Sequence, residues 1–266
     1  MKQVAITGGG GYIGGQTAIY FKEQGWEVTV VDRNNLPKRL EPFVDRFIHD
    51  EFHNEDALKQ FAHVDSIIHC AGSSLVGPSI KNPSQYYENN FIATKRMLDY
   101  LCQYGYYPKF VFSSSAAVYG NPIATPISEE DPKFPISPYG ISKHMVEQLL
   151  ETYSEAYGLN YVGLRYFNVF GKHQDPDGAY AAAIPKFIRH LIRHEAPTMH
   201  GDGTQSRDFT YIKNVIHANH IAALSSNPTA VNEVYNVAFG DSTNLNELIN
   251  ILQELLGDFD PRILDV

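Results

Sequence analysis

Two side chains near the middle of the chain have the types and the spacing for acid–base chemistry. Tyr139 and Lys143 are four residues apart, in Tyr139-Gly140-Ile141-Ser142-Lys143. On a helix, this spacing places a phenol and an ammonium group on one face, one turn apart. A free tyrosine has a pKa of about 10, and a fixed neighbouring cation favours the phenolate. The pair predicts a general base, and an ordinary surface pair on an amphipathic helix is the alternative.

Hydroxyl groups precede this pair in the sequence. Ser113, Ser114 and Ser115 lie where a central strand is predicted to end. Ligands bind at the carboxyl ends of the strands in an open parallel sheet. The serines therefore favour the catalytic interpretation of Tyr139 and Lys143 over the surface pair.

A run of glycines follows the first predicted strand. Gly8 to Gly11 lead through Tyr12 and Ile13 to Gly14, at the start of a predicted helix. Such a loop permits a turn with positive φ, lets the backbone approach a pyrophosphate and presents free N–H groups. It predicts dinucleotide binding, and a flexible turn is the alternative.

The end of the second predicted strand indicates which dinucleotide is bound. Asp32 lies 18 positions beyond Gly14, where a carboxylate accepts hydrogen bonds from the ribose hydroxyls of the adenosine half. A 2′-phosphate would be repelled there, so NAD is preferred over NADP, although the adjacent Arg33 leaves NADP open. Asp50, after a third short strand, is expected to reach the adenine.

The elements that position these residues alternate along the chain. Short β-branched runs predict strands at 4–7, 27–31, 66–69, 109–113 and 161–165. Longer stretches, each ended by a glycine, predict helices at 12–24, 83–104 and 138–157. This alternation predicts an α/β fold with a Rossmann-type, doubly wound parallel sheet.

The composition and the pattern of the sequence change after Arg165. A Gly/Asp/Pro-rich loop at 171–178 and a helix-like segment at 180–194 precede further strand-like segments at 208–212 and 234–237. We therefore expect a dinucleotide-binding domain at 1–168 with a returning segment at about 207–238. A smaller, interleaved substrate region would comprise 169–206 and 239–266.

Composition excludes several classes of protein. The 266 residues carry a formal net charge of -9, which argues against binding to nucleic acid or to an anionic membrane surface. Two isolated cysteines, and no apolar stretch at the N-terminus, favour a reducing, cytoplasmic location. The histidine pairs 190/194 and 217/220 lack neighbouring acidic or cysteine ligands, so no metal site is expected.

Taken in order, these motifs resemble the extended short-chain dehydrogenase/reductase family, and within it the NAD-dependent nucleotide-sugar 4-epimerases. The resemblance covers nearly the whole chain. It rests on the glycine loop, Asp32, residues 69–72, Asn90 with Thr94, Ser115 with 118–120, Tyr139 with Lys143, and residues 165–168, 201–203 and 207–209. Residues 166–171, 174–176 and 178–182 look most like the branch that acts on UDP-N-acetylhexosamines.

The resemblance implies a mechanism. Tyr139, assisted by Ser115, would remove the proton of the sugar 4-hydroxyl while C4 gives a hydride to the nicotinamide. Lys143 would lower the pKa of Tyr139 and hold the nicotinamide ribose. The 4-keto sugar would then turn over and take the hydride back on its other face, with NAD staying tightly bound. Related dehydratases and decarboxylases carry acidic residues where this chain has Ala116 and Ala117, so they are disfavoured.

The resemblance also assigns residues to the two ligands. The expected cofactor-binding residues are Gly8, Gly11, Tyr12, Ile13, Gly14, Asp32, Asn35, Asp50, Ala71, Gly72, Asn90, Tyr139, Lys143 and Tyr166. The expected residues for the UDP-sugar are Ser74, Ser115, Ala117, Asn168, Ala179, Tyr180, His200, Arg207 and Arg262. Among these, Arg207 would clamp the diphosphate, Asn168 would donate an amide hydrogen bond to it, and His200 would stack on uracil.

The assembly and the end of the chain leave alternatives open. In the family, the helices that correspond to 83–104 and 138–157 pair in a homodimer. Met145, Val146, Leu149 and Leu150 offer an apolar stripe for that contact or for the chain's own sheet. The chain ends soon after Gly257, so the substrate region is expected to be cut short or to be an open natural variant. Besides an active epimerase, the alternatives are another nucleotide-sugar oxidoreductase or epimerase and a silent NAD- or nucleotide-sugar-binding protein.

Overall fold

The computed structural model describes residues 1–175, 183–199 and 201–257. The chain divides into two compact units. The first comprises Met1–Tyr166 and Lys213–Val237, and the second comprises the chain between them together with the residues from Ala238 onward. The returning segment thus begins at Lys213, later than the expected position near 207, because the short strands before it pair within the second unit.

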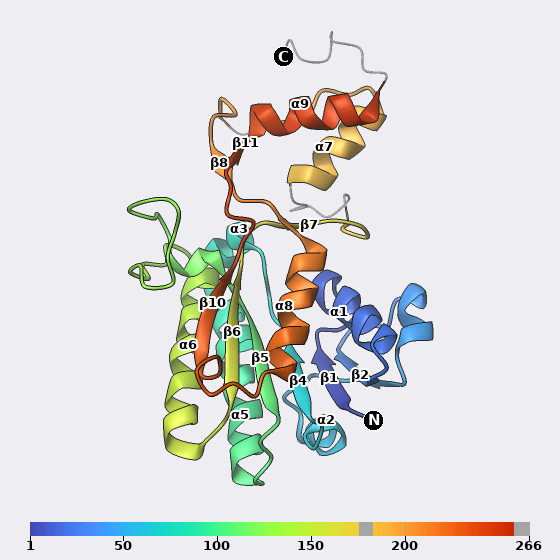
Figure 1. Cartoon of the computed structure of the whole chain (residues 1–266), viewed down its shortest axis with the longest axis vertical. Helices are drawn as coiled ribbons and strands as arrows, with labels where there is room; N and C mark the ends of the chain where they lie inside the picture. The colour runs from blue at the N-terminus through green and yellow to red at the C-terminus, as the bar shows by residue number, and fades with distance from the viewer. Residues whose placement is uncertain (176–182, 200, 258–266) are drawn as a thin grey trace. The chain divides into compact units, whose positions relative to one another are not determined.

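A seven-stranded sheet forms the centre of the first unit (Figure 1). Its strands, in the order β3-β2-β1-β4-β5-β6-β10, are all parallel. Their bounds are β1 Gln3–Thr7, β2 Glu27–Asp32, β3 Arg46–His49, β4 Ser66–His69, β5 Lys109–Ser115, β6 Tyr161–Tyr166 and β10 Glu233–Val237. The expected doubly wound α/β fold is confirmed. Because the strand order reverses between β1 and β4, the ligand crevice of such a sheet lies there.

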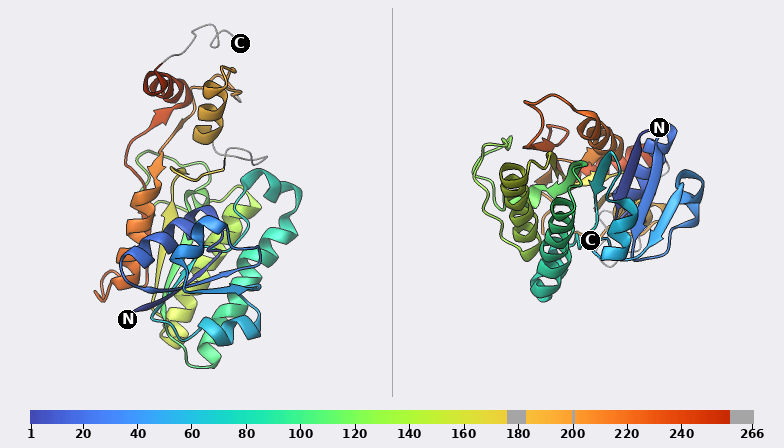
Figure 2. Two further views of the ribbon diagram at one scale, coloured as in Figure 1. Left: turned by 90° about the vertical axis from the view of Figure 1, so that its right-hand side faces the viewer. Right: turned by 90° about the horizontal axis from the view of Figure 1, so that it is seen from below.

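Helices cover both faces of this sheet (Figure 2). Apolar side chains of α2 (Glu55–Phe61), α5 (Ala93–Gln103) and α6 (Pro138–Tyr157) pack on one face, in a core that includes Ala5 of β1. On the other face α1 (Tyr12–Glu23) lies beside α8 (Ile212–Leu224), whose His220 contacts the ring of Phe21. Burial on both faces explains why the central strands are apolar at consecutive positions.

The helix expected at 83–104 is interrupted by a π-helical segment. It consists of α4 (Pro83–Tyr86), the π-helical η2 (Tyr87–Ile92) and α5. Such π-helical turns within α-helices often mark functional sites. The wider turn contains Asn90, which is one of the residues expected to bind the cofactor.

Capping residues define both ends of helix α6. Ser137 caps its start, because its Oγ accepts the Gly140 N–H at 3.1 Å. Gly158 ends it with φ of 76°, a conformation that favours glycine. These caps fix where Tyr139 and Lys143 fall on the helix. Two residues of the apolar stripe, Val146 and Leu150, are buried in the chain's own core.

The described residues of the second unit form two short strand pairs and two helices. The parallel pair is β7 (Val169–Phe170) with β9 (Thr210–Tyr211), and the antiparallel pair is β8 (Ser206–Arg207) with β11 (Thr243–Asn244). Residues 208–212 were expected as one strand, but only 210–211 are extended and paired, and α8 begins at Ile212. The helices α7 (Ala183–Ile192) and α9 (Leu245–Leu256) bury an apolar core between them.

The remaining elements are short. They are the 3-10 turns η1 (Lys38–Phe43) and η3 (Ala116–Val118) and the helix α3 (Val76–Lys81). Among the described residues, no helix has both the length and the apolar character needed to span a bilayer. Within the same residues, histidine, cysteine and acidic side chains form no group of three that could hold a metal ion.

Candidate active site

The glycine loop is built without room for side chains. Gly8 has φ of 69°, and a Cβ atom on it would lie 2.6 Å from the backbone N of Ala71, which follows β4. A Cβ atom on Gly14 would lie 2.4 Å from the carbonyl oxygen of Gly8. The Gly11 N–H donates to that same oxygen at 3.1 Å, which closes the turn. The loop is therefore packed tightly between β1, β4 and α1, at the reversal of the strand order.

Asp32 lies at the end of β2, beside this loop. Its Oδ2 accepts the Gly10 N–H at 3.0 Å, and its Oδ1 accepts the Asn34 N–H at 2.9 Å. The Asp50 N–H donates to the Asp32 carbonyl at 3.1 Å, so the ends of β2 and β3 are joined. This arrangement holds the Asp32 carboxylate next to the turn where a dinucleotide pyrophosphate would bind. Asn35, expected in the same site, is exposed.

Asn90 connects the loop after β4 to helix α6 through hydrogen bonds. Its Oδ1 accepts the Ser73 N–H at 2.7 Å, and its Nδ2 donates to the Ser73 carbonyl at 2.9 Å and to Ser142 Oγ at 2.9 Å. Gly72 has φ of 145°, and a Cβ atom there would lie 2.8 Å from Asn90 Oδ1. The loop of Ala71 and Gly72 is thus held against the helix that carries Tyr139 and Lys143.

Ser115, Tyr139 and Lys143 come together between β5 and α6. The hydroxyl group of Ser115 lies close enough to that of Tyr139 to affect its pKa. Lys143 is buried, and its Nζ donates to the Ser113 carbonyl at 2.7 Å and lies 4.8 Å from the centre of the Phe112 ring. The sequence predicted a shared helix face for the tyrosine and lysine, and the fold adds the serine from the neighbouring strand.

Burial sets the electrostatics of this cluster. It raises the pKa of Tyr139, and the nearby hydroxyl group of Ser115 opposes that rise. It also lowers the pKa of Lys143 to about 8. This differs from the expectation that Lys143 lowers the pKa of Tyr139, because the ammonium group is directed at the Ser113 carbonyl and desolvation of the phenol dominates.

A buried histidine supports the strands beneath the site. His69 of β4 contacts Thr7 Oγ1 through Nδ1 at 2.6 Å and Thr94 Oγ1 through Nε2 at 2.8 Å. Because Thr94 donates its only hydroxyl proton to the Asn90 carbonyl, Nε2 must carry the imidazole proton and Nδ1 must accept from Thr7. Burial lowers the pKa of His69 to about 3, so the ring is neutral.

Tyr166, expected to bind the cofactor, has its hydroxyl in a buried chain of hydrogen bonds. The hydroxyl donates to Asn219 Oδ1 at 2.6 Å and lies 3.1 Å from Ser113 Oγ. Asn219 Nδ2 donates in turn to Thr17 Oγ1 of α1 at 3.1 Å. Tyr166 thereby links helix α1, which follows the glycine loop, to strand β5, whose Ser113 carbonyl accepts the hydrogen bond from Lys143.

Two of the expected substrate residues lie close together in the second unit. Asn168 Nδ2 donates to the carbonyl of Asp208, the neighbour of the exposed Arg207. The Asp208 carboxylate also accepts the N–H groups of Phe239 and Gly240, at 2.9 and 2.7 Å. Asp208 organises this loop, a role that its place beside Arg207 did not reveal.

The other expected substrate residues are placed as follows. Ser74 is exposed after β4, and Ala117 lies in the turn η3 after Ser115. Ala179, Tyr180, His200 and Arg262 lie outside the described residues.

Gly140 and Ser142 have structural roles beside Tyr139 and Lys143 that did not emerge from the sequence. A Cβ atom on Gly140 would lie 2.5 Å from the Ala117 carbonyl oxygen, so only glycine lets α6 begin against that turn. Ser142 Oγ accepts from Asn90 and donates to the Tyr139 carbonyl at 2.7 Å. Their positions inside the Tyr139–Lys143 motif were the available signal.

These features define a Rossmann-type dinucleotide-binding protein. A glycine loop, a carboxylate at the end of β2 and the cluster of the partly buried Ser115 with the buried Tyr139 and Lys143 lie at the carboxyl edge of one parallel sheet, at its strand-order reversal. The residues fit NAD, because the loop is shaped for a pyrophosphate and Asp32 is placed for a ribose diol.

Comparison with known proteins places the chain within this class. Residues 4–238 match the NAD dependent epimerase/dehydratase family, and the chain belongs to that family. A curated relative, the putative UDP-glucose 4-epimerase of Methanocaldococcus jannaschii, is 36% identical over 261 residues, which is 96% of this chain and 82% of that protein. The resemblance found in the sequence, and NAD as the cofactor, are confirmed.

Solved structures show the same similarity. The UDP-N-acetylglucosamine 4-epimerase from Methanobrevibacter ruminantium M1, in complex with UDP-N-acetylmuramic acid, has a TM-score of 0.88 and 36% identity over 97% of this chain and 83% of that one. The UDP-glucose 4-epimerase of Thermus thermophilus, in complex with NAD, has a TM-score of 0.83 and 30% identity over 96% of this chain and 84% of that one.

Proposed function

We propose that this chain is an NAD-dependent 4-epimerase of UDP-sugars and that Ser115, Tyr139 and Lys143 carry the reaction. The observation that carries the proposal is the convergence of these three side chains at the carboxyl end of β5. Ala116 and Ala117 follow Ser115 directly. With no acid or base at those two positions, removal of a C5 proton or elimination of water has no obvious agent, and oxidation and reduction at C4 is the chemistry left.

The proton follows a path through Tyr139. In its phenolate form, Tyr139 would accept the proton of the sugar 4-hydroxyl, and Ser115, whose hydroxyl lies near the phenol, would orient that 4-hydroxyl. The proton returns from Tyr139 to the same oxygen when the 4-keto sugar is reduced on its opposite face. NAD, when bound, would supply the hydride acceptor for the oxidation at C4 and the hydride donor for the reduction.

Lys143 has two roles in this proposal. Its ammonium group is held by the Ser113 carbonyl, near Gly72, where the nicotinamide ribose would bind. Its second proposed role is to favour the phenolate of Tyr139 through its positive charge during the reaction, while in this structure burial sets the direction of the Tyr139 pKa shift. The contacts of Asn90 with Ser73 and Gly72 hold the backbone next to that position.

We propose UDP-N-acetylglucosamine and UDP-N-acetylgalactosamine as the substrate pair, with UDP-glucose and UDP-galactose as the second candidate. The similarity of residues 166–171 and 174–176 to the branch that acts on UDP-N-acetylhexosamines supports the first pair. The solved relative from Methanobrevibacter ruminantium M1 is named for N-acetylglucosamine, and the curated relative from Methanocaldococcus jannaschii is named for glucose.

The diphosphate requires local positive charge in a protein of net charge -9. We assign this role to Arg207. Asn168 is proposed to assist it, because the Asn168 amide donates to the carbonyl of Asp208, the residue next to Arg207. Ser74, Ala117, Ala179, Tyr180, His200 and Arg262 complete the proposed substrate set. We also propose a homodimer, for which Met145 and Leu149 remain at least partly accessible on α6.

A coupled epimerase assay on both substrate pairs tests the proposal. The wild type should interconvert one pair, and Tyr139→Phe should lose about 10²–10⁴-fold in kcat while still binding NAD. Turnover of neither pair by a protein that binds UDP-sugar would instead identify a silent binding protein. Unchanged turnover in Tyr139→Phe would refute the assignment of the base. Sedimentation of the wild type tests the dimer.

A further inference from the structure

Helix α6 carries a buried carboxylate on the same face as Tyr139 and Lys143. Glu147 lies one turn beyond Lys143 on the same helix face and is 5% exposed. The proposed reaction does not use it. Because burying a charge is costly unless the charge is paired and hydrogen-bonded, its partners reveal what the carboxylate does.

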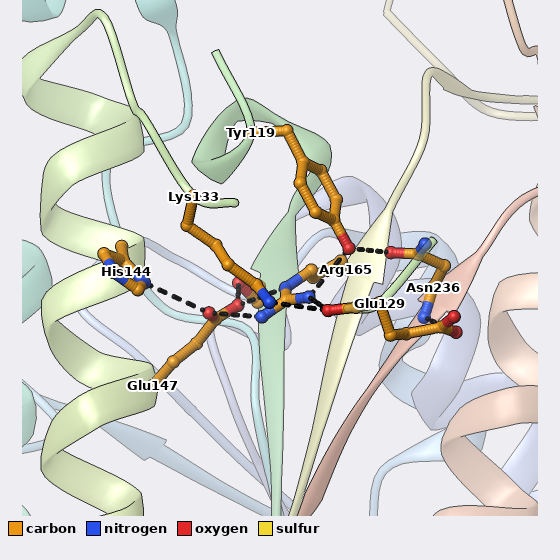
Figure 3. Close-up of polar contacts among 8 residues, drawn as sticks. Tyr119, Glu129, Lys133, His144, Glu147, Arg165 and Asn236 are labelled. Atoms are coloured by element: carbon orange, nitrogen blue, oxygen red, sulfur yellow. Dashed lines mark hydrogen bonds and ion pairs between the residues drawn. The ribbon is translucent and has the colours of Figure 1, made fainter. Parts of the chain in front are cut away.

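Those partners lie on the two strands next to α6 (Figure 3). Arg165 of β6 donates Nε to Oε1 and Nη2 to Oε2, each at 2.9 Å, in a two-pronged contact. Ser114 of β5 donates its hydroxyl to Oε1 at 2.5 Å. Ser114 precedes Ser115 and is the register partner of Arg165 in the sheet. The carboxylate thus joins the helix that carries Tyr139 and Lys143 to the strand that carries Ser115.

Arg165 extends the connection to the turn after Ser115. Its Nη1 donates to the Tyr119 hydroxyl at 2.7 Å, and that hydroxyl donates to Asn236 Oδ1 at 2.7 Å. The Asn236 N–H donates to Glu129 Oε1 at 2.8 Å, within the loop that leads to α6 (Figure 3). Both segments that flank the catalytic cluster in the chain, the turn after Ser115 and the loop before Tyr139, are therefore tied to Arg165.

The carboxylate also acts on Lys143 through its charge. Burial raises the pKa of Glu147, but hydrogen bonds from His144, Arg165 and Ser114 outweigh it, so the group stays ionised. Its negative charge opposes the lowering of the Lys143 pKa by burial. The titratable groups around the pair are His144 on α6, Arg165 on β6, His69 on β4, Cys70 after β4 and, at the edge, Tyr161.

We propose that Glu147, held by Arg165 and Ser114, is a positioning residue for the reaction. It fixes the setting of α6 against β5, so that the Tyr139 hydroxyl stays near that of Ser115 and the Lys143 ammonium stays charged on the Ser113 carbonyl. This proposal rests on the proposed roles of Ser115, Tyr139 and Lys143. The competing interpretation is that the ion pair contributes only to folding stability.

Three variants separate the two interpretations. Glu147→Gln keeps the size and one acceptor oxygen but removes the charge. A double variant, Glu147→Met with Arg165→Met, removes both charges, and replacing a buried ion pair by apolar side chains is often neutral for stability. Glu151→Gln is the matched control, because it removes a carboxylate one turn further along the same helix from an exposed position.

We expect kcat to fall by about 10- to 100-fold in Glu147→Gln and in the double variant, with KM and NAD content close to the wild type. In Glu147→Gln the alkaline limb of the kcat profile should also move to lower pH, because Lys143 loses a nearby negative charge. Glu151→Gln should match the wild type in both respects. A folded double variant with wild-type kcat would overturn the positioning role, since it would show that the pair only stabilises.

A second measurement does not depend on turnover. In protein with isotope-labelled lysine, the titration of Lys143 can be followed by NMR and assigned with Lys143→Arg. Its midpoint should move to lower pH in Glu147→Gln and stay in place in Glu151→Gln, whether or not the wild type epimerises a sugar. An unmoved midpoint in Glu147→Gln would overturn the electrostatic part of the proposal, and absence of turnover in the wild type alone would count against the proposed function instead.

Discussion

Mild acid should destabilise this protein through a single buried histidine. His69 is 1% exposed and is held neutral between Thr7 and Thr94. Its pKa is lowered by burial from 6.5 to about 3. Between these values the unfolded chain binds a proton that the folded protein does not, so stability is fully present above pH 6.5 and is lost as the pH falls.

The size of the effect follows from the two pKa values. At pH 5 the folded ring is still almost entirely neutral, whereas the unfolded ring is almost fully protonated. Linkage then gives a loss of about 2 kcal/mol between pH 7.5 and pH 5 from this residue alone. The result hardly changes if the folded pKa is a unit higher, because pH 5 still lies above it. Burial lowers the pKa of His53 and His220 as well, so the contribution of His69 has to be measured as a difference.

Urea unfolding followed by circular dichroism, at pH 5 and pH 7.5, provides that difference. The His69→Asn variant keeps an acceptor near Thr7 and removes the titrating ring, so it should lose about 2 kcal/mol less than the wild type over this interval. The exposed His63→Asn is the matched control and should behave as the wild type. Equal losses in His69→Asn and in the wild type would refute the assignment of a neutral, buried His69.

Three further outcomes follow from the site. Gly8→Ala should weaken NAD binding, measured by calorimetry, and should lower the free energy of unfolding by about 1–2 kcal/mol. The reason is that Gly8 has φ of 69° and that a Cβ atom there would meet Ala71. Wild-type affinity of this variant for NAD would contradict the tight packing of the glycine loop. Asp32→Asn should reduce the preference for NAD over NADP in competitive binding, since the repulsion of a 2′-phosphate is removed, and an unchanged ratio would exclude that role. In a kcat profile of the wild type, activity should decline above about pH 8 as Lys143, whose pKa burial lowers to about 8, loses its proton; a profile flat well beyond that pH would show that the ammonium is not needed.

Much of the nucleotide half was predictable because its signals are local. The glycine loop, Asp32 and the i, i+4 spacing of Tyr139 and Lys143 each depend on residues that are close in sequence and on one helix turn or strand end. Alternating strand and helix patterns were sufficient to predict a doubly wound parallel sheet, because the right-handed crossover leaves few other topologies. Where the expected bounds failed, at 208–212, the pairing partner β7 lies about 40 residues away in the chain.

The sequence alone determined which groups are present and which of them share a helix face or a strand end. Only the tertiary structure decided that burial raises the pKa of the Tyr139 phenol and that Glu147 is paired with Arg165. These contacts join α6 to β5 and β6, so they depend on how the helix packs on the sheet. Burial and charge pairing arise from that packing, and no spacing along the chain encodes them by itself.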